Sequence, residues 1–181
     1  MTEIRESILT VRSALSSKAD AGPAPDRPAV AVMEDGLRCR AEGGDGWVIL
    51  TDMPAAVGGG SSAPTPGWLI RAALASCAAT TIAMRAAELE IPLSRLEVTA
   101  ESETDMRGLL AVGNGVQPGP STARLRVAVE AEGVDPQRLE ELVEWADNHS
   151  PVGDCVWRAV PFEVEITAGG RRRRWQEATK C

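Results

Sequence analysis

Cysteine is the residue type through which this chain could carry out demanding chemistry. Its 181 residues include four cysteines, at positions 39, 77, 155 and 181, but only one histidine and no tyrosine. No two cysteines have CxxC spacing, and a single histidine removes most metal sites. A Ser-His-Asp arrangement could be built only on His149. A nucleophilic thiol is therefore the first candidate, and no metal or other cofactor is expected.

Cys77 is the best placed of these thiols. It lies in the middle of residues 66–89, where Thr65-Pro66 is typical of a helix start and apolar residues continue nearly all round the predicted helix. A helix without a polar face is buried on all sides. Composition alone favours a small buried hydrophobe at Cys77, because a reactive thiol needs an electropositive, partly open setting.

The remaining sequence predicts an α+β protein. Further helices are expected over residues 3–17 and from Asp135-Pro136 to about 149, and short strands over 29–34, 37–42 and 47–52. Strict alternation of apolar and polar residues predicts more strands, at 96–101, 123–131 and 162–166. Because each of these has one polar face, we expect antiparallel pairing.

The charge distribution argues against two classes of partner. The net charge is −7, and the last eleven residues, with four arginines, one lysine and one glutamate, carry +4, which leaves −11 for residues 1–170. Because residues 1–170 are so acidic, this part of the chain is a poor partner for nucleic acid or an anionic membrane. The uncharged stretch inside the predicted helix, residues 72–84, is shorter than the roughly 20 residues that span a bilayer. The N-terminus lacks the apolar run of a signal peptide, so a cytoplasmic location is expected.

Around Cys77 the sequence resembles a known family. The run "PGWLIRAALASC" at residues 66–77 is similar to the central helix of the OsmC/Ohr family of thiol peroxidases. The resemblance continues in the strand "RLEVTAE", in a helix that ends in "HSPVGD" and in the closing strand "VPFEVEI". It covers residues 29–168 and leaves out an N-terminal helix and linker (1–28) and a basic C-terminal tail (169–181).

The resemblance implies a fold, an assembly and a reaction. It implies an intertwined homodimer in which antiparallel sheets wrap two central helices, with the peroxidatic cysteine at Cys77. The thiolate of such a cysteine attacks a peroxide, becomes a sulfenic acid and condenses with a second thiol. An organic hydroperoxide suits an apolar site, and an external thiol is the expected reductant.

Two positions depart from the family pattern, and a third is ambiguous. Ser150 stands where the family has its resolving cysteine, and a hydroxyl cannot form a disulfide. Gly67 stands where many members have a glutamate, ten residues before the peroxidatic cysteine. The arginine that this glutamate orients has two candidates here, Arg38 and Arg40, and an exposed strand face is an equal interpretation of both.

Cys155 is a possible resolving thiol. In a regular helix it lies about 140° around and ~7.5 Å along from Ser150, so packing is the favoured interpretation. We therefore expect the sulfenic acid at Cys77 to wait for an external thiol.

Two functions remain open at this point. The first is an OsmC-type hydroperoxide reductase with an altered resolving step, which the retained Cys77 favours. The second is a non-catalytic protein of the same fold that binds a small hydrophobic ligand, which Ser150 favours.

Overall fold

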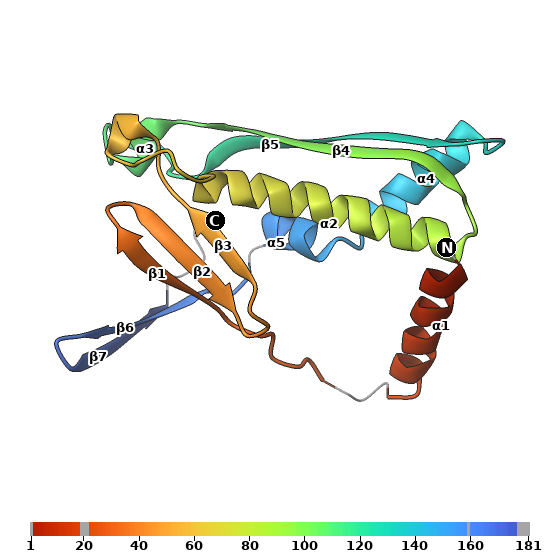
Figure 1. Ribbon diagram of the computed structural model, residues 1–181, viewed down its shortest axis with the longest axis horizontal. Coiled ribbons are helices and arrows are strands. Elements are labelled where there is room, and N and C mark those ends of the chain that lie inside the picture. The colour runs from red at the N-terminus through yellow and green to blue at the C-terminus, as the bar shows by residue number, and fades with distance from the viewer. Residues whose placement is uncertain (1, 19–21, 159, 177–181) are drawn as a thin grey trace.

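The structure is a computed structural model that describes residues 2–18, 22–158 and 160–176 (Figure 1). Helices and strands follow one another in the order α1 (Thr2–Ser16), β1 (Ala29–Asp35), β2 (Arg38–Gly43), β3 (Val48–Thr51), η1 (Ala55–Val57, a short 3-10 helix), α2 (Pro66–Glu88), β4 (Leu93–Thr104), α3 (Met106–Leu109), β5 (Pro120–Ala131), α4 (Pro136–Asp147), α5 (Pro151–Trp157), β6 (Glu163–Ala168) and β7 (Arg171–Gln176). The α+β class predicted from the sequence is confirmed.

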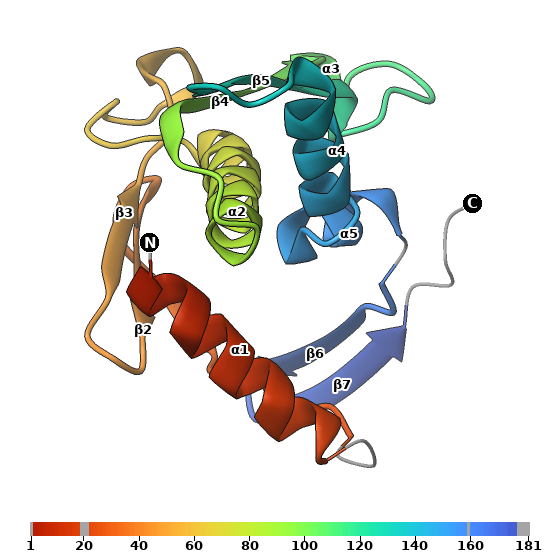
Figure 2. The same ribbon diagram turned by 90° about the vertical axis from the view of Figure 1, so that its right-hand side faces the viewer.

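The strands form three antiparallel units, β1-β2-β3, β4-β5 and β6-β7. In the long β4-β5 hairpin, Leu96 pairs with Val129 and Val98 with Val127. Because side chains alternate between the faces of a strand, this register places the apolar residues together on one face. That face covers α2 and α4, which lie side by side beneath it (Figure 2).

The core lies where α2, α4 and the β4-β5 hairpin meet. Its buried residues are Ile82, Ala86, Ile91, Leu139, Leu142 and Ala146. Alanine at two of these positions lets the helix backbones approach closely. This packing fixes α4, and with it the turn into α5, relative to α2.

Helix α2 begins as the sequence predicts, with the Thr65 hydroxyl accepting a hydrogen bond from the Trp68 backbone N–H at 3.2 Å. Its burial is one-sided, however. Leu74, Ala78 and Ile82, at four-residue spacing, are buried, whereas Met84, on the opposite side of the helix, is 44% exposed. A single chain therefore does not supply the all-round cover that the composition of this helix predicts.

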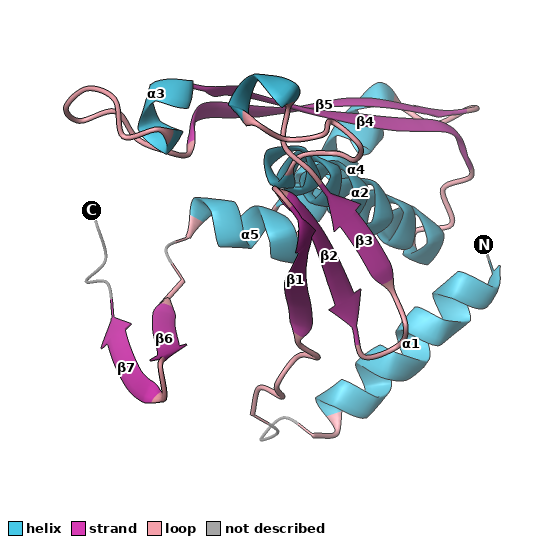
Figure 3. Cartoon of the chain, turned by 60° about the vertical axis from the view of Figure 1, so that its left-hand side comes forward, coloured by secondary structure: helices cyan, strands magenta, loops and turns pink. Residues whose placement is uncertain are grey.

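The surface of the single chain is far larger than that of a compact monomer. It measures 13811 Å², whereas a folded monomer of this mass exposes about 8,400 Å². Every residue of β1 is exposed, and the β6-β7 hairpin extends away from the helices (Figure 3). The excess lies in arms that an isolated chain leaves uncovered.

The C-terminal region differs from the expected basic tail at residues 169–181. Residues Arg171–Gln176 form β7, and two of its arginines pair with carboxylates across the hairpin, Arg172 with Glu165 and Arg174 with Glu163 at 2.9 Å. A run of arginines lacks the apolar alternation that marks a half-buried strand, so periodicity could not reveal β7. Residues 177–181 lie outside the described part of the chain.

Candidate functional site

The thiol of Cys77 and the hydroxyl of Ser150 are in contact. Ser150 Oγ donates a hydrogen bond to Cys77 Sγ at 3.3 Å and accepts one from the Gly153 backbone N–H at 3.1 Å. Ser150 is only 4% exposed and Cys77 is half-buried. The structure thus brings together the two residues that the family pattern aligns, 73 positions apart in sequence.

The turn from α4 into α5 fixes the Ser150 hydroxyl. Ser150 is the N-cap of α5 and Pro151 occupies the first helical position, which suits its missing N–H. A Cβ on Gly153 would lie 3.1 Å from both Cβ and Oγ of Ser150, so glycine allows the close approach. One side chain therefore serves as a helix cap and as a donor to the sulfur.

The side chains of Arg85, Trp145 and His149 stack on one another next to this turn. The Arg85 guanidinium on α2 lies 4.4 Å from the Trp145 ring centroid, and Trp145 stacks on His149 with centroids 3.9 Å apart. His149 Nδ1 lies 2.6 Å from the Trp145 carbonyl oxygen. The ring of His149, next to Ser150 in sequence, is held by Trp145 rather than directed at Cys77, in keeping with a structural role instead of that of a base.

Ion pairs connect helix α1 to the C-terminal end of α2. Arg12 forms an ion pair with Glu88, whose side chain is only 6% exposed, and Arg85 Nη1 lies 3.0 Å from the same carboxylate. Arg5 Nε lies 3.7 Å from Glu90. These ion pairs place α1 against the C-terminal end of α2.

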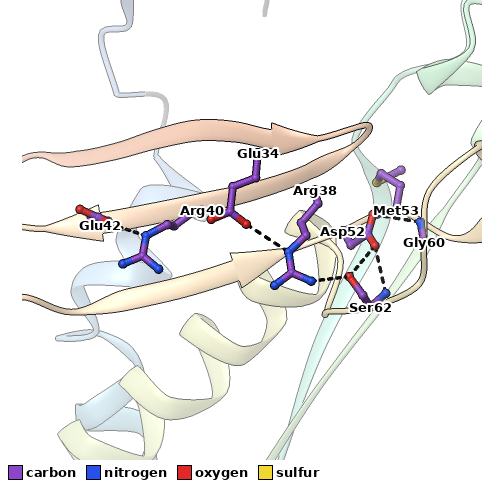
Figure 4. A network of polar contacts seen from close by, with 8 residues as sticks. All are labelled: Glu34, Arg38, Arg40, Glu42, Asp52, Met53, Gly60 and Ser62. Carbon is purple, nitrogen blue, oxygen red and sulfur yellow. Dashed lines mark hydrogen bonds and ion pairs between the residues drawn. The ribbon is translucent and has the colours of Figure 1, made fainter.

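The two candidate arginines, Arg38 and Arg40, have different hydrogen-bond partners (Figure 4). Arg38 Nε donates to Glu34 at 3.2 Å, and Arg38 Nη1 donates to Ser62 Oγ at 3.1 Å. Ser62 Oγ in turn donates to Asp52 at 2.8 Å. Arg40 pairs only with its strand neighbour Glu42 among the described residues. Arg38 therefore contacts the loop that leads into α2, whereas Arg40, which is half-buried on the same strand, pairs with its neighbour in β2.

Asp52 is the centre of that loop. Its carboxylate is 2% exposed and accepts hydrogen bonds from the backbone N–H groups of Met53, Gly60 and Ser62. Together with the Ser62 hydroxyl, these donors lower the pKa of Asp52 to about 2. Gly59 is needed here because a Cβ would come within 1.9 Å of the Met53 carbonyl oxygen. Sequence reasoning missed this role, since an aspartate before a Gly-Ser loop is too common to single out.

An Asp52→Asn variant tests this account of the loop. Because the pKa of Asp52 is about 2 in the folded chain and 3.8 ordinarily, the ionised carboxylate stabilises the fold above pH 3.8, and that stabilisation is lost as the pH falls toward 2. We expect the variant to unfold at lower urea concentration than the parent at pH 7, with the difference shrinking between pH 4 and pH 2. The exposed Asp26→Asn is the matched control, and a difference that does not change with pH contradicts the account.

The other cysteines of the described chain lie apart from this pair. Cys155 is exposed on α5, five residues beyond Ser150, and its neighbour in α5, Asp154, pairs with Arg158 at 2.6 Å. Cys39 is half-buried in β2, opposite Thr51 of β3. No three His, Cys, Asp or Glu side chains of the described residues converge in a way that could hold a metal ion.

Comparisons with known proteins identify the family. The model of the family described as OsmC-like protein matches residues 58–165, more than half of the chain. No functionally curated protein matches.

Among solved structures, an OsmC-like protein from Mycoplasma pneumoniae superposes with a TM-score of 0.63 at 13% identity, covering 76% of this chain and 91% of that one. An organic hydroperoxide resistance protein from Legionella pneumophila gives 0.52 at 23%, covering 75% and 91%. A third, from Elizabethkingia anophelis, gives 0.55 at 17%, also covering 75% and 91%. At these identities the structures show a shared fold, and with the family match they establish that the chain belongs to the OsmC-like protein family.

Proposed function

We propose that this protein is a thiol-dependent organic hydroperoxide reductase in which Cys77 is the nucleophile. The observation that supports it most is the contact between Cys77 Sγ and the Ser150 hydroxyl, within a family whose solved members include organic hydroperoxide resistance proteins. A hydroxyl that donates to sulfur stabilises negative charge there. The half-buried position of Cys77 also leaves the sulfur open to a small substrate.

The reaction proceeds in two stages. The Cys77 thiolate attacks the terminal oxygen of the hydroperoxide and the O–O bond breaks; the sulfur is oxidised to a sulfenic acid, and the alkoxide takes up a proton to leave as an alcohol. An external thiol then displaces water from the sulfenic acid to form a mixed disulfide. A second external thiol attacks that disulfide, which restores Cys77 and releases the external disulfide.

Ser150 determines which thiol reduces the sulfenic acid in the second stage. It holds the place next to the sulfur but cannot form a disulfide, so the reductant must come from solution. Cys155, exposed on α5, is the remaining internal candidate and a less favoured one. Arg38 is preferred to Arg40 as partner of the thiolate, because its hydrogen bond to Ser62, which in turn donates to the buried Asp52, holds it against the loop before α2.

Assembly and location are part of the same proposal. The uncovered side of α2 and the exposed strand β1 favour a homodimer in which each chain covers the other. Helix α2 has the length and composition of a membrane span, as core helices of soluble proteins also do, and in this family of soluble proteins it is the central helix of the fold. A cytoplasmic location keeps Cys77 reduced between turnovers.

A second candidate function rests on the exchange at position 150. Without a resolving cysteine there, and with Gly67 in place of the family's glutamate, the same fold could bind a small hydrophobic ligand without turnover. An apolar cavity of about 340 Å³ between the β4-β5 hairpin and helices α2, α4 and α5 is large enough for such a ligand. Trapping of the oxidised thiol separates the two.

The decisive experiment is to trap the sulfenic acid. After treatment with one equivalent of an organic hydroperoxide, a dimedone-type reagent is expected to label Cys77 before Cys39, Cys155 or Cys181 (the last lies outside the described residues). Peptide mapping by mass spectrometry measures the labels, with Cys77→Ser as control. Label confined to Cys155 or Cys181 contradicts the reductase and leaves the binding protein.

A further inference from the structure

Helix α1 carries a row of apolar side chains that its own chain leaves largely exposed. Four residues recur at the spacing of one helix face and are called here the α1 stripe: Ile4, Ile8, Val11 and Leu15. Ile4 is 48%, Val11 57% and Leu15 64% exposed. A contiguous apolar surface of this kind marks an interaction site, which single exposed apolar residues do not. The stripe lies outside residues 58–165, which the family model matches, so the family match gives it no role.

The α1 stripe runs beside the contact with α2 and not within it. Arg5 and Arg12 form the ion pairs that connect α1 to the C-terminal end of α2. Ile4 precedes Arg5 and Val11 precedes Arg12, and successive residues of a helix are about 100° apart around its axis. One edge of α1 therefore meets α2, while the stripe faces a neighbouring direction.

Helix α1 and the β1-β2-β3 sheet lie toward opposite ends of α2, both on the side away from the β4-β5 hairpin (Figure 1, Figure 2). Between them lies the uncovered side of α2. Its exposed residues there are small: Ala73, Ser76, Thr80 and Ala83. Because small side chains allow a short distance between helix axes, a second helix can pack closely on this side.

A two-fold axis determines what the α1 stripe meets. In a symmetric dimer the same surfaces of both copies come together. When the uncovered sides of the two α2 helices face each other antiparallel, the C-terminal end of each lies beside the N-terminal end of the other. Helix α1 of one copy then meets the β1-β2-β3 sheet of the other, whose exposed apolar side chains include Val30, Val32 and Ile49. A parallel arrangement places α1 against α1 and brings like ends of the helix dipoles together.

We propose that the α1 stripe docks on the β1-β2-β3 sheet of a second copy of this chain. The inference rests on the proposed homodimer and adds the role of α1 to it. A lipid surface is a poorer occupant, because the two arginines and two glutamates of α1 cancel, whereas helices that lie on membranes are rich in basic residues. The sheet also carries Arg38, the preferred partner of the thiolate, so α1 of one copy supports the arginine-bearing sheet of the other.

Replacing two stripe residues by glutamine tests the contact. Val11→Gln/Leu15→Gln removes apolar surface, leaves the charge unchanged and keeps a good helix propensity. Because symmetry repeats the contact, each dimer loses four apolar side chains, and we expect its Kd to rise at least about a hundredfold. Sedimentation velocity on labelled protein from nanomolar to micromolar concentration measures this. Thr10→Gln/Ser13→Gln, at exposed polar positions of α1, is the matched control and should leave the Kd unchanged.

Hydrogen exchange identifies the surface that the α1 stripe covers. At concentrations where the parent and the Val11→Gln/Leu15→Gln variant are both dimers, amides of β2 and β3 should exchange faster in the variant. Within one chain the sheet lies at the other end of α2 from α1, so a change in the sheet reports a contact between copies. Faster exchange confined to α1 and the end of α2 contradicts the proposed docking surface.

The remaining outcomes separate this inference from the proposals on which it rests. A dimeric parent whose Kd does not change in the Val11→Gln/Leu15→Gln variant overturns the α1 contact and leaves the homodimer standing. A monomeric parent overturns both. Vesicles of phosphatidylcholine and phosphatidylglycerol that bind the parent but not the variant, with an unchanged Kd of the dimer, assign the stripe to lipid instead. Consumption of an organic hydroperoxide, assayed separately, reports on the reductase function alone.

Discussion

Oxidation of a Ser150→Cys variant by one equivalent of organic hydroperoxide is expected to give a nearly stoichiometric disulfide between Cys77 and the introduced thiol. The reason is geometric: Ser150 Oγ already lies 3.3 Å from Cys77 Sγ, at a turn held by the α5 cap and the stacked Trp145. A thiol at that point attacks the sulfenic sulfur and releases water. Peptide mapping without added thiol measures the product.

The parent protein should behave differently under the same treatment. With no thiol at position 150, its sulfenic acid persists, and excess hydroperoxide drives Cys77 to the irreversible sulfinic acid. A Cys155→Ser substitution in both backgrounds should change neither result. A stoichiometric crosslink between Cys77 and Cys155 in the parent contradicts this prediction and makes Cys155 the resolving residue.

The second large effect concerns assembly. Light scattering is expected to give twice the chain mass of 19.1 kDa at micromolar concentration. The isolated chain exposes roughly 5,400 Å² more than a compact monomer, so two chains together have more excess surface than the about 2,000–5,000 Å² that obligate homodimers commonly bury in total. Placing a charge on β1 with Val32→Glu, at a side chain 60% exposed in the single chain, should abolish the dimer and much of the folded structure with it.

Thr99→Glu is the matched control for that substitution. Thr99 is also a β-branched strand residue, but it lies on the exposed face of β4, between the half-buried Val98 and Ala100. We expect this variant to remain a folded dimer by light scattering and circular dichroism. A folded parent of 19.1 kDa, or equal loss of assembly in both variants, contradicts the proposed homodimer.

The sequence predicted those elements whose patterns reflect burial within one chain. Alternation located β4 and β5, and the Thr65-Pro66 cap located the start of α2, because both signals arise from contacts that form locally or across one hairpin. α5 was read as the end of the preceding helix, since Ser150-Pro151 can both follow one helix and begin the next. β7 was read as a tail, because its arginines pair with carboxylates across the hairpin instead of packing in a core.

The site was predictable in its parts but not in its geometry. Cys77 and Ser150 were singled out from family resemblance, yet their contact depends on how α4 packs on α2, which no local pattern specifies. The choice between Arg38 and Arg40 needed the structure as well. It depends on the buried Asp52, whose partners are mostly backbone N–H groups of the loop that Asp52 itself begins.

The unpaired edge of β1 affects the half-life of a newly synthesised chain. If the proposed homodimer covers this edge, then before a second copy binds, Val30, Val32 and the backbone groups of the strand are available to proteases and to other unpaired strands. Encounter with a second copy is a second-order process, so its waiting time shortens as synthesis rises. We therefore expect the half-life of this protein to lengthen with its own expression level, so that a burst of synthesis yields proportionally more surviving protein than slow basal production.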